Sequence, residues 1–153
     1  MISPRSTMPT PKPGRKRLVI DTNLFISAII HPDRTPATGI KIAVTHFDIV
    51  VSPETLAELL TIPRRAYLDQ YATVEDRMLR VGAYVQLLEQ VAIKEHVTDC
   101  TDPKDNMFLS TALAARASVL ISGDKRHLLS MNPYRGVEII TMRHFVDHYQ
   151  DYL

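Results

Sequence analysis

Two aspartates in this sequence each follow a short apolar run that has the composition of a buried strand. Asp21 comes directly after Leu-Val-Ile at 18–20, and Asp124 follows Val-Leu-Ile at 119–121 across a Ser-Gly pair. In an open parallel sheet, binding and catalytic sites form just beyond the carboxyl ends of the strands. Both carboxylates are therefore predicted to lie at one sheet edge. The simpler alternatives are that Asp21 caps the next helix and that Asp124 belongs to a turn.

Two further acids are placed so that they can join this pair. Asp105 lies at the start of the predicted helix that leads into the strand before Asp124, and Glu58 lies within a helix after another predicted strand. Each also has a structural explanation. Residues 102–105 resemble a helix start with Asp102 as its cap. Glu58 could lie on a solvated helix face, although Glu54, one turn earlier, would then repel it.

Carboxylates that converge at one sheet edge repel one another unless positive charge is bound among them. Mg²⁺ or Mn²⁺, which prefers carboxylate and water oxygens, suits a site without Cys or His at ligand spacing. Two such ions about 4 Å apart can activate water on one side of a phosphodiester and stabilise the leaving oxygen on the other. The predicted metal ligands and catalytic acids of such a phosphodiester hydrolase are Asp21, Glu58, Asp105 and Asp124.

The single cysteine and the histidines indicate little further chemistry. Cys100 has no partner for a disulfide within the chain, and the six histidines do not combine with it at zinc-ligand spacing. A structural zinc site is therefore not expected. A catalytic thiol is possible in principle, but a lone cysteine is more often incidental.

The elements that must position the acids are short strands alternating with helices. Ser52 followed by Pro53 is a strong helix start, because serine caps a helix and proline suits its first turn. Strands separated by helices predict an α/β domain, a three-layer α/β/α sandwich with a mostly parallel sheet. The predicted strands span residues 18–20, 47–51, 91–93, 119–121 and 137–140, and the predicted helices residues 23–30, 38–45, 53–62, 73–90, 106–117 and 142–149.

The chain length suits one domain preceded by a tail. At 153 residues, 45% of them hydrophobic and 23% charged, the composition is that of an ordinary globular protein. Residues 1–16 are rich in proline and basic residues and are expected to form a flexible tail, which leaves 17–153 as the domain. The apolar stretch 18–30 is too short and too polar for a membrane span, and no signal peptide is evident, so a cytoplasmic location without membrane contact is expected.

Charge is distributed unevenly along the chain. Residues 1–17 carry five basic residues and no acid, which leaves 13 basic and 17 acidic residues, a balance of −4, in the remainder. Affinity for nucleic acid comes largely from Lys and Arg that neutralise phosphates. An acidic domain that acts on nucleic acid therefore needs local basic residues or bound cations at its site.

Four blocks of residues occur in an order that resembles the PIN domain, over roughly residues 18–146. The first block alone is moderately specific, whereas the ordered set is highly specific. The branch that it resembles most contains toxins of bacterial toxin–antitoxin pairs. The blocks are Val19-Ile20-Asp21-Thr22-Asn23, Ser52-Pro53-Glu54 running on to Glu58, Asp102-Pro103-Lys104-Asp105-Asn106, and Ile121-Ser122-Gly123-Asp124 followed by Leu128-Leu129.

This resemblance implies a PIN-like sandwich that cleaves RNA with Mg²⁺ or Mn²⁺. It also implies a homodimer and a cognate antitoxin whose cationic segment occupies the acidic cleft. All four positions of the family's acidic quartet are filled. Asn23 and Ser122 would be polar supports that hydrogen-bond the acidic ligands or the water. Asp102 is an additional acid of this branch. The quartet, carried onto matching positions, is Asp21, Glu58, Asp105 and Asp124.

Basic and aromatic residues near these acids are candidates for contact with RNA. Basic side chains can bind phosphates, although a solvated surface charge explains any one of them equally well. His127 is a candidate general acid because imidazole titrates near neutral pH. Tyrosines can stack on bases, although aromatics spaced along helices more often belong to the core. The candidates for phosphate contact are Arg64, Arg65, Lys104, Lys125 and Arg126, and those for stacking are Tyr67, Tyr71 and Tyr84.

Other functions fit the sequence less well. A haloacid-dehalogenase-like phosphatase needs an Asp two residues after the first, where this chain has Asn23. A response-regulator receiver needs adjacent acids before the first site Asp and a Lys after a later strand, and that pattern is not found. A non-catalytic RNA- or protein-binding module on the same fold is the alternative from another class. The intact quartet argues against it, since such a module has no need of clustered carboxylates.

Overall fold

A computed structural model describes residues 14–124 and 126–153. Its centre is a five-stranded sheet in the order β3-β2-β1-β4-β5, in which each neighbouring pair is parallel. The strands are β1 (Arg17–Ile20), β2 (Asp48–Val51), β3 (Glu89–Gln90), β4 (Val119–Ile121) and β5 (Glu138–Ile140). The α-helices are α1 (Thr22–Ile30), α2 (Thr35–His46), α3 (Pro53–Thr61), α4 (Val74–Val85), α5 (Asn106–Ala115) and α6 (Met142–His148). Short 3-10 helices are η2 (Ile62–Arg64), η3 (Ala66–Gln70), η4 (Pro103–Asp105), η5 (Leu129–Met131) and η6 (Tyr149–Tyr152).

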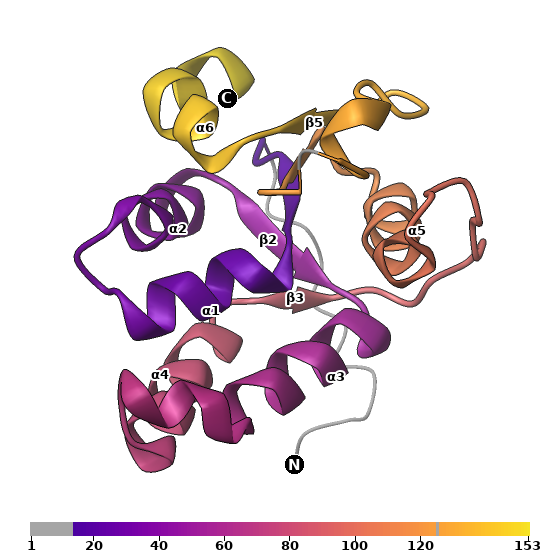
Figure 1. Cartoon of the computed structure of the whole chain (residues 1–153). Helices are drawn as coiled ribbons and strands as arrows, with labels where there is room; N and C mark the ends of the chain where they lie inside the picture. The colour runs from indigo at the N-terminus through magenta and orange to yellow at the C-terminus, as the bar shows by residue number, and fades with distance from the viewer. Residues whose placement is uncertain (1–13, 125) are drawn as a thin grey trace, which may run out of the picture.

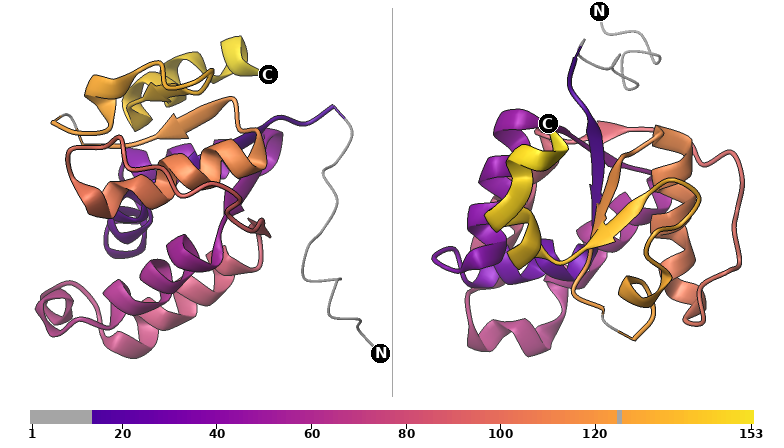
Figure 2. Two further views of the ribbon diagram at one scale, coloured as in Figure 1. Left: turned by 90° about the vertical axis from the view of Figure 1, so that its right-hand side faces the viewer. Right: turned by 90° about the horizontal axis from the view of Figure 1, so that it is seen from above.

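The sheet is covered on both faces, which confirms the predicted three-layer α/β/α sandwich. Successive side chains of β1 alternate between two cores, because side chains along a strand point to opposite faces. Leu18 and Ile20 pack with apolar residues of α1, α2 and α6, whereas Val19 packs with those of α5. Seen from above, the sheet lies between α2 and α6 on one side and α5 on the other (Figure 2).

Helices α3 and α4, together with residues 62–73 that connect them, form an arm beside this sandwich. They lie together below α1 in Figure 1. A third apolar cluster joins the arm to α1, in which Ile26 and Ile29 pack against Leu68 and Val81. The arm therefore forms one wall of any site located between α1 and α3.

The close approach of α2 and α6 depends on a glycine. A Cβ built at Gly39 would lie 2.1 Å from the Sδ atom of Met142, far inside van der Waals contact. A side chain at this position would force the Met142 side chain of α6 to move.

Three predicted elements had wrong boundaries. The helix expected over 73–90 ends at Val85, and β3 is formed by Glu89–Gln90 instead of the expected 91–93. Val85 and Leu88 keep helical spacing, but a backbone bond from Leu88 N–H to Val85 O turns the chain there, so the apolar pattern runs past the helix end. The helix expected over 106–117 ends at Ala115, because Arg116 adopts a left-handed conformation with φ of 52°.

The described end of the predicted tail is joined to the domain. Arg15 forms an ion pair of 3.3 Å with Asp48, and its guanidinium donates a hydrogen bond of 2.8 Å to Val44 O. The backbone N–H of Asp48 donates to Lys16 O. The ordered domain therefore begins before Arg17, while residues 1–13 of the predicted tail lie outside the described residues. In the described part of the chain, no helix is long and apolar enough to cross a membrane.

Candidate active site

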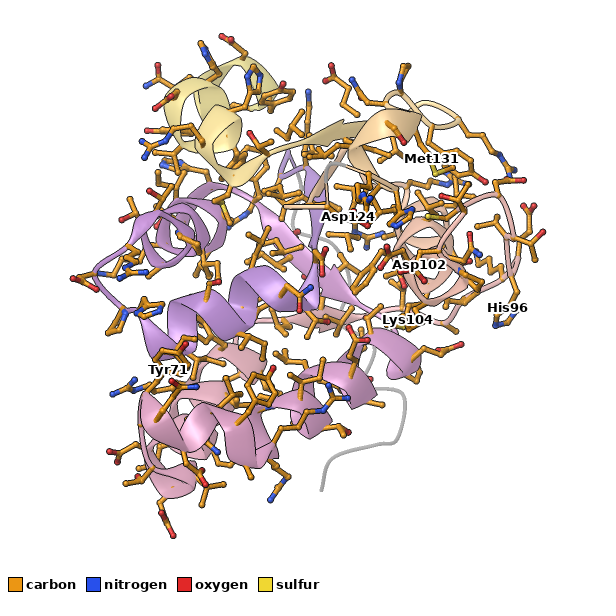
Figure 3. The ribbon with its side chains drawn as sticks, viewed as in Figure 1. Tyr71, His96, Asp102, Lys104, Asp124 and Met131 are labelled. Atoms are coloured by element: carbon orange, nitrogen blue, oxygen red, sulfur yellow. The ribbon has the colours of Figure 1, made fainter. Side chains whose placement is uncertain are left out.

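The four predicted acids line one pocket at the carboxyl edge of the sheet. The pocket has a volume of about 620 Å³, and Asp102 lines it with them. Asp21 follows β1 and Asp124 follows β4, while Asp105 ends η4 and Glu58 lies in the second turn of α3. Figure 3 labels Asp102, Lys104 and Asp124 near one another between the sheet edge and α5. Elements far apart in sequence thus bring the predicted carboxylates together.

Asp21 is both a helix cap and a pocket residue, so the two interpretations of it do not exclude each other. Its Oδ1 accepts a hydrogen bond of 3.1 Å from the backbone N–H of Asn23 at the start of α1. The cap fixes the carboxylate, which is almost entirely buried at 4% exposed. The side chain of Asn23 lines the same pocket.

Ser122 joins the two strand-end aspartates. Its hydroxyl donates a hydrogen bond of 3.0 Å to Asp21 Oδ2 and accepts one of 3.0 Å from the backbone N–H of Asp124. Ser122 is fully buried, and its own N–H donates to Ile140 O of the edge strand. Ser122 therefore hydrogen-bonds the side chain of one predicted ligand and the backbone of another.

The carboxyl groups of the pocket perturb one another. Burial raises the pKa of Asp21, and the charges of Glu58 and Asp124 raise it further, against hydrogen bonds from Asn23 and Ser122 that lower it. Burial, a hydrogen bond with Asp124 and neighbouring negative charges raise the pKa of Asp105 to about 7.

The pKa of Asp124 moves in the opposite direction. Burial raises it, but hydrogen bonds from the Asp105 carboxyl and from the N–H groups of Arg126 and His127 outweigh burial, so the net pKa is lowered. The pKa values of Asp105 and Asp124 are therefore displaced in opposite directions, as those of neighbouring carboxyl groups are when no cation separates them.

The donors of the pocket fit a hard divalent cation by their chemistry. All four are carboxylates, the ligand type that Mg²⁺ and Mn²⁺ prefer. Within residues 14–124 and 126–153, however, no three Asp, Glu, His or Cys side chains already form a ligand group. The raised pKa of Asp105 means that this carboxyl group must lose its proton before it can bind a cation.

Basic residues form part of the pocket wall. Arg65 and Lys104 line it, whereas Arg64 is exposed in η2 and is not among the lining residues. Arg126 is also outside the lining, and its contact with Asp124 is made by its backbone N–H. Lys125 lies outside the described residues.

His127 lines the pocket with its ring held in place. Its Nδ1 lies 2.8 Å from Thr101 Oγ1, a contact that the sequence did not suggest. Among the tyrosines, Tyr84 packs against Phe25 with ring centroids 5.7 Å apart, as a core residue would, so the suggestion that it stacks on bases was wrong. Tyr67 and Tyr71 are exposed.

Comparison with known proteins decides the family. The model of the PIN domain matches residues 17–126, a span that contains all four acids. The chain belongs to the PIN domain family. This PIN-domain chain is 27% identical over 147 residues to an uncharacterized protein of Methanocaldococcus jannaschii, an alignment that covers 90% of this chain and 94% of the relative.

Solved structures share the PIN fold at low sequence identity. VapBC2 from Rickettsia felis, bound to a DNA fragment from its promoter, has a TM-score of 0.60 at 14% identity and covers 82% of this chain and 98% of its own. DNA-bound VapBC from Salmonella typhimurium has a TM-score of 0.59 at 16% identity, with coverages of 83% and 98%. PAE2754 from Pyrobaculum aerophilum has a TM-score of 0.61 at 13% identity, with coverages of 94% and 99%.

Proposed function

We propose that this chain is a metal-dependent endoribonuclease that hydrolyses RNA phosphodiesters with carboxylate-bound Mg²⁺ or Mn²⁺. The observation that carries the proposal is the convergence of Asp21, Glu58, Asp105 and Asp124 on one pocket at the carboxyl edge of a PIN domain. Buried carboxyl groups that raise one another's pKa destabilise a fold, and a bound cation offsets that cost. A binding module without catalysis has no use for such an arrangement.

Each residue of the site has a role in this proposal. The four acids hold the cation, and Ser122 keeps Asp21 and Asp124 in a fixed relation. Asn23 lines the same pocket and would hydrogen-bond an acidic ligand or the metal-bound water, and Asp102 adds negative charge to the lining. When bound, the cation activates a water and stabilises negative charge on the departing oxygen.

Phosphates of the substrate need positive charge near this acidic pocket. Arg65 and Lys104 line the pocket and would bind phosphates of the substrate near the scissile bond. Arg64, Lys125 and Arg126 remain candidates for more peripheral phosphate contacts.

We also propose that the protein is the toxin of a toxin–antitoxin pair and forms a homodimer. VapBC assemblies are among the structures that share its fold. An acidic pocket of this kind is suited to a cationic antitoxin segment, which would exclude RNA from the site. A neighbouring gene for a small protein with a basic tail would support the pairing, and light scattering of the purified chain tests the dimer.

The test of the ribonuclease is a cation titration on single-stranded and structured RNA. We expect cleavage with Mg²⁺ or Mn²⁺, no cleavage in excess chelator, and no cleavage by the Asp21→Asn variant, which should fold normally because it loses a buried charge. Full activity of that variant, or of the wild type in chelator, would overturn the metal mechanism. Tight RNA binding without cleavage under all conditions would favour the non-catalytic module.

A further inference from the structure

The pocket extends well beyond the acids, along a groove between α1 and the arm. Asn23 and Ser27 of α1 line one side, and Ile62 and Arg65 of the arm line the other. Residues four apart on a helix lie on the same face. The next residue of that face after Ser27 is His31, which ends α1 and whose N–H donates a hydrogen bond of 2.8 Å to Ser27 O.

His31 meets an exposed aromatic ring of the arm. Its imidazole packs edge-to-face against Tyr71, with ring centroids 5.4 Å apart and an interplanar angle of 74°. Tyr71 remains 48% exposed, so much of its ring faces solvent although the contact with His31 limits its rotation. In Figure 3 Tyr71 lies by the end of α1 that is remote from the labelled Asp124 and Lys104.

A buried arginine fixes the segment that carries Arg65 and Tyr71. Arg77 of α4 is fully buried. Its guanidinium donates hydrogen bonds of 2.7 Å to Pro63 O and 3.3 Å to Arg65 O, another to Ala72 O, and a bond of 3.0 Å to the Asp69 carboxylate. One side chain therefore holds both ends of residues 63–72. A groove wall held in this way is preorganised, which reduces the entropy lost when a ligand binds.

We propose that the surface just beyond this groove, where His31 and Tyr71 meet outside its lining, is a base-binding subsite for single-stranded RNA, in which Tyr71 stacks on an unpaired base and Arg65 contacts a phosphate between that base and the acids. This subsite rests on the proposed ribonuclease function and adds to that function a preference for single-stranded RNA. From Asn23 to His31 the helix rises about 12 Å. A stacked strand advances about 3.4 Å per nucleotide. The stacked base is therefore about three to four nucleotides away from the scissile phosphate, and it must be unpaired for its face to be free.

The test compares long single-stranded RNA of randomised sequence with randomised dinucleotides, which are too short to reach Tyr71. Stacking of a base on an aromatic side chain changes affinity by about 5- to 150-fold. We expect Tyr71→Ala to raise KM for the long RNA by a factor in this range, with kcat and dinucleotide cleavage unchanged. Tyr71→Phe keeps the ring and should restore the wild-type KM. Leu79→Ala, which removes an exposed apolar side chain of α4 outside the pair with His31, is the control.

The outcomes separate this subsite from the ribonuclease itself. A Tyr71→Ala variant that cleaves long RNA with the wild-type KM, or loses long RNA and dinucleotides equally, overturns the subsite and leaves the nuclease intact. If the wild type cleaves neither substrate, the ribonuclease proposal fails, and fluorescence anisotropy with labelled single-stranded RNA still decides on the subsite. Weaker binding by Tyr71→Ala than by Tyr71→Phe supports it, and equal binding overturns it. Annealing the RNA to its complement should remove the difference between the variants.

Discussion

Replacing Asp105 by asparagine should stabilise the metal-free protein at alkaline pH. The pKa of Asp105 is raised from 3.8 to about 7, so between these values the folded state holds a proton that the unfolded state has released. Stability contributed by this group is present below pH 4 and is lost as the pH rises through about 7. A shift of this size corresponds to roughly 4 kcal/mol for a group shielded from water. Because Asp105 is partly exposed, screening reduces the effect to about 1–2 kcal/mol.

The assay for this prediction is urea unfolding in chelator at pH 5 and pH 8. The introduced amide carries no charge and still offers an N–H to the Asp124 carboxylate, so Asp105→Asn should gain about 1–2 kcal/mol over the wild type at pH 8 and much less at pH 5. The lowered pKa of Asp124 acts below pH 4 and does not enter this window. Asp33→Asn, at an exposed position, controls for the general effect of removing a negative charge. Equal stability of the wild type and Asp105→Asn at pH 8 would show that folding does not raise the pKa of Asp105.

Three further predictions follow from the packing and the tail. Ser122→Ala removes the hydroxyl that binds Asp21 and should lower the free energy of unfolding by about 1–3 kcal/mol and reduce RNA cleavage, as urea titration and initial rates would measure. Gly39→Ala forces a methyl group into Met142 and should destabilise the fold by about 1–3 kcal/mol, so an unchanged melting temperature would contradict the packing described for α2 and α6. Deletion of residues 1–14 should leave the melting temperature by calorimetry unchanged, and a large fall would show that this segment is part of the fold.

The strand-end acids could be predicted because local sequence already fixes their position. A buried apolar run defines a strand, and in a parallel sheet the residue after it must lie at the functional edge. Asp21 and Asp124 needed no further information than this. Asp105 and Glu58 lie on helices, whose faces depend on packing, and it was the ordered PIN-like blocks that placed them in the same site.

Other features depended on contacts that the sequence pattern does not encode. Arg77 has the appearance of one charged residue among many on an amphipathic helix, and only the carbonyl groups of a distant loop explain its burial. The end of α4 was misplaced because Leu88 keeps helical spacing after the chain has turned. The fixed ring of His127 depends on Thr101, which is 26 residues away along the chain.

The most direct test of the account is anomalous diffraction from crystals of the wild-type protein soaked with Mn²⁺ above pH 7. Anomalous density should appear among the carboxylates of Asp21, Glu58, Asp105 and Asp124, and it should be absent from crystals of Asp21→Asn. Acidic side chains that stay paired with each other or with arginine at saturating Mn²⁺, with no density in the pocket, would contradict the claim that they form a cation site.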